Sequence, residues 1–147
     1  MKKTSITILT IIFLMSCSTT GDKNNARYHL YENYITDNEL TPVDRIRTFK
    51  MLNWKSLDNR HLIISSFHKK HYLISLNSFC QDLDSAHTIA LDQSMDNSLY
   101  AKFDSVIVST QQHIKCRIST IHLLDQAQDK EVVNLRKKLR ESDKSNH

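Results

Sequence analysis

Regular alternation between apolar and polar residues is the strongest structural pattern in this chain. It is cleanest over residues 114–119, where Ile114, Cys116 and Ile118 alternate with polar side chains, and it recurs over residues 71–76. A period of two is typical of a strand that buries one face against a core. Both segments are therefore predicted to be strands of one sheet.

Four more segments have the composition of strands, and residues 67–70 form a hairpin-length connection. These segments are residues 43–51, 62–66, 88–91 and 104–110. The expected fold class is α+β and β-dominated, with a small antiparallel sheet of about six short strands that can curl into a partial barrel. A turn region is expected around Trp54, a helical turn at 80–86 and a polar loop at 92–98.

Helical periodicity flanks the predicted sheet on both sides. The apolar positions with helical spacing are Tyr28, Tyr31 and Ile35 before the sheet, and Val132, Leu135 and Leu139 after it. The tyrosines are expected to pack on the domain; an aromatic patch for a glycan or a partner is the alternative. The basic C-terminal segment, residues 126–147, is expected to be a loosely docked helix. Binding of that segment to anionic lipid headgroups is the other interpretation.

Residues 1–16 have the plan of a secretory signal, since two lysines precede an apolar run from Ile6 to Met15. The run is too short for a transmembrane helix, which needs about 20 residues. The sequence Leu14-Met15-Ser16-Cys17 resembles a bacterial lipobox, in which the cysteine receives diacylglycerol before the signal is cleaved. We therefore predict a lipoprotein anchored through Cys17; an ordinary signal peptide with a chance cysteine is the alternative.

Acylation of Cys17 determines the expected location. Two or more acyl chains hold a protein stably on a bilayer, whereas one chain holds it reversibly. Ser18 follows the cysteine at the position where an Asp would retain an enterobacterial lipoprotein at the inner membrane. The expected location is the bacterial cell envelope, on the outer membrane and facing the periplasm.

These patterns divide the chain into four parts. Residues 1–16 are the expected signal peptide, and residues 17–41 are a lipid anchor and tether with a short helix. Residues 42–125 form a single disulfide-stapled domain that begins at Pro42, and residues 126–147 are the basic C-terminal helix or tail.

The composition argues against one class of function, nucleic-acid binding. The formal net charge is +4, of which the signal segment supplies two, and this is too little for the concentrated basic face of a nucleic-acid-binding protein. Gly21 and Pro42 are the only residues of their types. Turns are therefore expected to rely on Asn, Asp, Ser and Lys, since Asn and Asp tolerate left-handed backbone.

Cys80 and Cys116 are the two cysteines that remain beyond Cys17. An even number of cysteines in an oxidising compartment favours a disulfide, and the loop that they would close gives about 4 kcal/mol of stabilisation in the chain-entropy model. A redox-active or metal-binding pair is the alternative. The spacing lacks the Cys-x-x-Cys pattern that lowers a thiol pKa in oxidoreductases.

Residues from Val43 to about Leu124 resemble a family of small uncharacterised proteobacterial lipoproteins, classified as a domain of unknown function. The motifs that carry the resemblance are Trp54-x-x-Leu57-Asp58, Tyr72-Leu73-Ile74-x-Leu76, Cys80-x-x-Leu83, Phe103-Asp104-x-Val106 and Cys116-x-Ile118-x-x-Ile121. The resemblance implies that Cys80 pairs with Cys116 and that the protein belongs to the envelope; it implies no activity. The tail after Asp125 lies outside the motifs and is expected to be specific to this protein.

Eight histidines suggest a metal site. His68 and His71 have ligand-like spacing, and His61 could face them across the predicted hairpin. A structural zinc site usually needs a closed set of four ligands, and no cysteine or glutamate motif completes one here. Solvated surface histidines are the default interpretation, so these three residues remain weak candidates.

The favoured function is a non-catalytic envelope module without a cofactor. It would be held on the membrane by its lipid and would contact another periplasmic protein or the cell wall. The first alternative is a periplasmic metal-binding protein that uses His61, His68 and His71. The second is a hydrolase with an unrecognised site, which the absence of a Gly-x-Ser-x-Gly elbow disfavours.

Overall fold

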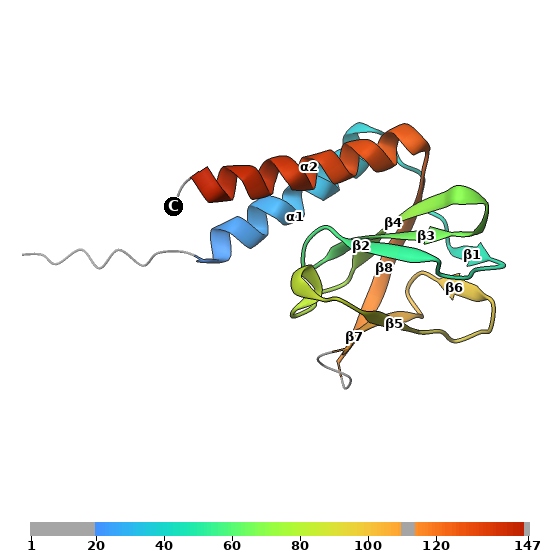
Figure 1. Ribbon diagram of the computed structural model, residues 1–147. Helices are drawn as coiled ribbons and strands as arrows, with labels where there is room; N and C mark the ends of the chain where they lie inside the picture. Colours follow the sequence, from blue (N-terminus) through green and yellow to red (C-terminus); the bar gives the residue numbers. More distant parts are fainter. Residues whose placement is uncertain (1–19, 110–113, 146–147) are drawn as a thin grey trace, which may run out of the picture.

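The structure of the protein is a computed structural model that describes residues 20–109 and 114–145 (Figure 1). Within these ranges, the side chains of residues 20–26, 68, 143 and 145 are left undescribed. Cys17 and the rest of the expected signal segment therefore lie outside the described residues.

The described chain contains two long helices, two short 3₁₀ helices and eight strands. In order they are α1 (Thr20–Asp37), β1 (Arg45–Arg47), β2 (Asn53–Ser56), β3 (His61–Ser66), η1 (Phe67–Lys69), β4 (Lys70–Leu76), η2 (Leu83–Ser85), β5 (Ile89–Asp92), β6 (Ser98–Tyr100), β7 (Ser105–Val108), β8 (Lys115–Leu124) and α2 (Gln126–Ser145).

Six of the strands form one antiparallel sheet that curls into a half-barrel (Figure 1). The strand order is β2-β3-β4-β8-β7-β5, so that the last strand of the chain, β8, lies between β4 and β7. Strands β1 and β6 pair separately as a two-stranded ribbon. The predicted α+β fold, with an antiparallel sheet and a C-terminal helix, is confirmed.

The larger core fills the inside of the half-barrel. Alternate residues of the central strands point inward, because successive side chains of a strand face opposite sides of the sheet. The ribbon adds Ile46 and Leu99 to this core, and Cys80 and Cys116 lie within it. The ribbon therefore closes the concave side of the sheet.

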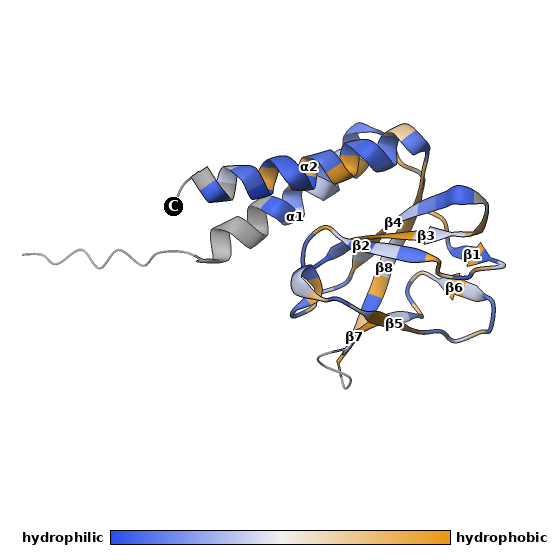
Figure 2. Cartoon of the chain, in the orientation of Figure 1, coloured by the Kyte–Doolittle hydropathy of each residue, from blue (hydrophilic) through white to orange (hydrophobic). Residues whose placement is uncertain are grey.

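The opposite face of the sheet carries both long helices (Figure 1). Here Ile63, Leu73 and Leu124 of the sheet pack with Tyr31 of α1 and Val132 of α2 in a second core. Figure 2 shows that the polar residues of α2 dominate its exposed surface, with apolar positions interspersed. Because the strands between the two cores are covered on both faces, they are apolar on both, as expected of a buried sheet.

Helix α2 docks more firmly than the sequence suggested. Val132 is fully buried, and α2 contacts both α1 and β8. The first half of α2 is therefore packed against the domain, whereas the described side chains from Arg140 onwards are exposed. Within the described residues, neither long helix has the combination of length and apolar character that a membrane crossing requires.

Several element boundaries differ from the sequence prediction. The segment 43–51 contributes only the three residues of β1, and α1 begins at Thr20, inside the expected tether. Two strands were missed: β2 lies in the expected turn region around Trp54, and β6 begins at the end of the expected polar loop. Both are short, and both carry polar residues that weaken the periodic pattern.

Turns are made without glycine. The described residues with positive φ are Glu39, Thr48, Lys69, Asp82, Asn97 and Lys102. Asp, Asn and Lys are among the residue types that the sequence predicted for turns. Thr48 is unusual, since a β-branched residue pays a steric cost for a φ of 51°.

Candidate functional site

Three ionisable side chains meet beneath α1. The imidazole of His61 is completely buried. Its Nδ1 lies 3.1 and 3.0 Å from the two carboxylate oxygens of Asp58, and its Nε2 lies 2.9 Å from Oε1 of Glu32. Both ring nitrogens are therefore engaged, and α1 is joined to the start of β3 through a single histidine.

Each charged group in this cluster stabilises the charged form of its neighbours. Burial lowers the pKa of His61, but the hydrogen bonds to Asp58 and Glu32 outweigh burial and raise its pKa above the ordinary value. The hydrogen bond from His61 in turn lowers the pKa of Glu32. The favoured state is an imidazolium that donates to both carboxylates, which is an ion cluster rather than a base poised for proton abstraction.

A second ionic cluster centres on Asp84, in η2. Its Oδ1 accepts from Arg136 at 3.0 Å, from Arg140 at 3.1 Å and from Ser56 at 3.1 Å. Its Oδ2 lies 3.4 Å from Nη1 of Arg27. Burial raises the pKa of Asp84, but the guanidinium groups outweigh this effect and lower it. One carboxylate thus joins both long helices to the loop that follows Cys80.

The histidines proposed as metal ligands do not converge. His61 pairs with Ser75 and His71 pairs with Ser65, so the two histidines lie at opposite ends of the β3–β4 hairpin. The expectation that His61 faces His71 is therefore wrong. The side chain of His68 lies outside the described residues. Nδ1 of His71 lies 3.5 Å from Oδ1 of Asp129. Among the described residues, no group of three potential ligands could hold a metal ion.

Cys80 and Cys116 form a disulfide, with their Cα atoms 5.7 Å apart. Both residues are buried in the core of the half-barrel. The disulfide links the loop before η2 to the start of β8, and the structure therefore gives these cysteines a covalent structural role.

A pocket opens where β1 passes the turn of the β3–β4 hairpin; we call it the hairpin pocket. It has a volume of about 280 Å³. Its floor consists of buried residues, and its rim consists of exposed residues. The floor contains Ile46, Ser66 and Tyr72, and the rim contains Arg47, Thr48, Phe67 and Lys70.

A wider hollow, the outer groove, continues from this pocket across Thr48 and Phe67, which line both. It has a volume of about 640 Å³. The segment from Thr48 to Met51 forms one side, and the loop that contains Asp96 and Asn97 forms the other. Together the two hollows provide room for a ligand larger than a single small molecule.

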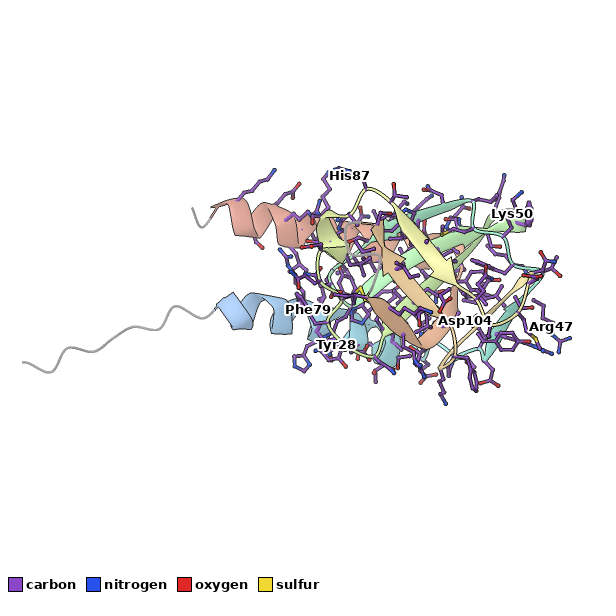
Figure 3. All side chains as sticks on the ribbon, turned by 90° about the horizontal axis from the view of Figure 1, so that it is seen from below. Tyr28, Arg47, Lys50, Phe79, His87 and Asp104 are labelled. Atoms are coloured by element: carbon purple, nitrogen blue, oxygen red, sulfur yellow. A yellow bond between two sulfur atoms is a disulfide. The ribbon has the colours of Figure 1, made fainter. Side chains whose placement is uncertain are left out.

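Cations gather at this end of the molecule, where Figure 3 places Arg47 and Lys50. The ammonium group of Lys50 lies 5.8 Å from the centre of the Phe67 ring. Within the part of the chain that the structure describes, no ion pair to a carboxylate forms at Arg47, Lys50 or Lys70. Asp96 faces the outer groove, so the excess of positive charge lies in the hairpin pocket.

The sequence analysis did not identify the hairpin pocket. Its basic residues come from two segments that lie far apart in the sequence, the one around Arg47 and the one around Lys70. Residues 43–51, which include Arg47, were predicted only to form a strand. The pairing of β4 with β3 and the path of β1 were needed to bring the two segments together.

The fold and these sites define the class of protein: a small α+β protein with a disulfide-stapled half-barrel, covered by two helices and carrying an open cationic pocket. A family described as a family of unknown function (DUF6491) matches residues 1–143, and the chain belongs to this family. No curated protein and no solved structure matches the chain. The match includes most of α2, so the expectation that the basic tail is specific to this protein is wrong.

Proposed function

We propose that this protein is a lipid-anchored, non-catalytic module of the bacterial cell envelope that binds a partner away from the membrane. Cys17 would carry the acyl chains and hold the protein on the periplasmic side of the outer membrane. The observation that carries the proposal is the position of Arg47, a residue of the hairpin pocket, which lies at the opposite end of the molecule from the start of α1 (Figure 3).

Helix α1 supports this arrangement as a rigid spacer. It starts at Thr20, close in sequence to the lipobox-like cysteine, and spans 18 residues. A helix of this length extends about 27 Å at 1.5 Å per residue. Tyr31, which is buried in the second core, and Glu32, which bonds to His61, fix the helix to the sheet.

Binding is favoured over catalysis by the state of the buried groups. His61 uses both ring nitrogens within the protein, so a substrate could not receive a proton from it without breaking the ion cluster. The hairpin pocket supplies cations, hydroxyl groups and an aromatic ring, which suit recognition.

Metabolic labelling with radioactive palmitate tests the anchor. We expect the full chain to incorporate the label and to sediment with outer-membrane fragments. The Cys17→Ala variant should remain unlabelled, because it lacks the thiol that receives the lipid. Ser16→Ala, which keeps a small residue before the cysteine, serves as the matched control and should be labelled.

An unlabelled full chain, or label that persists in Cys17→Ala, would contradict the anchor. Sedimentation of the labelled protein with the inner membrane alone would contradict the proposed location.

A further inference from the structure

We propose that the hairpin pocket binds a carboxylate-bearing sugar unit of an envelope glycan, with Arg47 and Lys70 holding the carboxylate. This inference deepens the proposed function and rests on it for the biological location only. The binding chemistry follows from the pocket itself.

The first argument is charge. Arg47 and Lys70 are exposed on the rim, and neither has an ion-pair partner among the described residues. The other residues of the pocket are uncharged. Two uncompensated cations beside one small cavity attract an anionic group, and charge-assisted hydrogen bonds to a carboxylate are the strong ones.

The second argument is an unused polar group in the pocket floor. Tyr72 lines the pocket, and no hydrogen bond joins its hydroxyl to another described residue. The residue as a whole is only 6% exposed, but its hydroxyl is not among the buried polar atoms that lack a partner, so this hydroxyl is accessible from the pocket. A tyrosine that lines a cavity beside two cations is therefore placed to donate to, or accept from, a bound molecule.

The third argument is backbone geometry at the rim. Thr48 has a φ of 51°, and it lines both the hairpin pocket and the outer groove. Strained positions of this kind concentrate at ligand sites. Because Thr48 lies where the two hollows meet, a bound polymer would pass this residue as it continues into the outer groove.

A sugar fits this pocket better than an extended peptide does. Peptides commonly bind by adding a strand to a free sheet edge. Strands β3 and β4, which contribute Ser66, Lys70 and Tyr72, are both paired on each side within the sheet. Strand β1, which contributes Ile46 and Arg47, pairs only with β6, so a peptide strand could be added only at β1. A compact pocket of about 280 Å³ with hydroxyl groups and the 42%-exposed ring of Phe67 instead suits one ring with an acidic substituent.

Isothermal titration tests the inference with the full chain purified in an uncharged detergent. The probes are glucuronate, its neutral analogue glucose, inorganic phosphate and an acidic pentapeptide that alternates Ala and Asp. We expect glucuronate to bind at least about tenfold more tightly than each of the other three, and its affinity to fall as salt is raised.

Three variants locate the binding site. Arg47→Ala and Lys70→Ala should each weaken glucuronate binding about tenfold, through loss of a charge-assisted contact. Tyr72→Phe should weaken it severalfold while leaving the melting temperature unchanged, because the lost hydroxyl has no partner in the folded protein. Lys137→Ala, which removes one charge from the exposed face of α2, is the matched control and should bind as the parent does.

Equal binding of glucuronate and glucose, no binding of glucuronate, or full binding by Arg47→Ala and Lys70→Ala would overturn the inference. Tighter binding of the pentapeptide would make the pocket a peptide site, and equally tight binding of phosphate would make it a simple anion site; both results also overturn it. A failed palmitate label would refute the anchor and leave this titration unaffected, so the two proposals can fail separately.

Discussion

At the residue scale, His61 shows how far a side chain can depart from what its position in the sequence suggests. The sequence made it a weak metal candidate near a hairpin. In the structure it is buried between Asp58, three residues before it, and Glu32 from α1. The contact with Asp58 is local, but the one with Glu32 depends on how α1 crosses the sheet, which no sequence pattern encodes.

The pKa shift of His61 gives a pH-dependent stability. Since the folded state raises the pKa of His61, its contribution is complete below the unfolded pKa of about 6.5. The contribution is lost as pH rises through the folded-state pKa. At pH 6, His61→Gln should lower the free energy of unfolding by about 3 kcal/mol, because it removes the buried cation between Asp58 and Glu32 and leaves Asp58 with backbone N–H donors alone. The difference in the free energy of unfolding between the parent and the variant should shrink as pH rises.

Urea denaturation of the parent and of His61→Gln between pH 6 and pH 9 measures this effect. His87→Gln, at an exposed position labelled in Figure 3, is the control and should change stability by less than about 0.5 kcal/mol. A deficit that grows with pH would mean that His61 is buried in its neutral form.

At the scale of the elements, the sequence located the long and periodic segments and missed the short ones. Strand β8 was found because its first residues alternate between exposed and buried positions, whereas β3, β4 and β7 were found as short runs of mostly buried, β-forming residues. Strand β6 has only three residues, and β2 has one apolar residue, Trp54, among three polar ones. The docking of α2 was also missed, since the surface that receives it comes from β4, β8 and α1.

The docking of α2 depends on Val132, which is fully buried in the second core. Val132→Ala removes two methyl groups and leaves a cavity, so we expect a loss of about 2 kcal/mol in the free energy of unfolding. Asn134→Ala, at an exposed position two residues further along α2, should be nearly neutral. Thermal or urea unfolding followed by circular dichroism measures both. If both substitutions changed the free energy of unfolding by the same small amount, the docking of α2 would contribute little to the stability of the protein.

At the scale of the whole molecule, the disulfide is the feature that the sequence predicted best and the strand order the one it predicted least. Two cysteines in a chain that is predicted to be exported leave few alternatives to a disulfide. The insertion of β8 between β4 and β7, by contrast, joins segments far apart in the sequence. A hydrophobic pattern shows which face of a strand is buried, but not which strand lies beside it.

Removal of the disulfide tests its contribution. The bond spans a sequence separation of 36 residues, and in the chain-entropy model its loss costs about 4 kcal/mol. The double variant Cys80→Ala and Cys116→Ala should therefore unfold at a much lower urea concentration than the parent. Reduced parent protein is the matched comparison and should show a similar loss. A loss below about 1 kcal/mol would mean that the core, not the covalent link, maintains the half-barrel.

Strand β4 separates the two layers of the molecule, and this has a consequence for which sequence changes the protein can tolerate. Lys70 and Tyr72 line the hairpin pocket, whereas the intervening His71 and the following Leu73 face the helices. Inserting or deleting one residue within β4 would turn every later side chain to the opposite face, sending pocket residues under the helices. The number of residues in β4 is thus as tightly constrained as their identity.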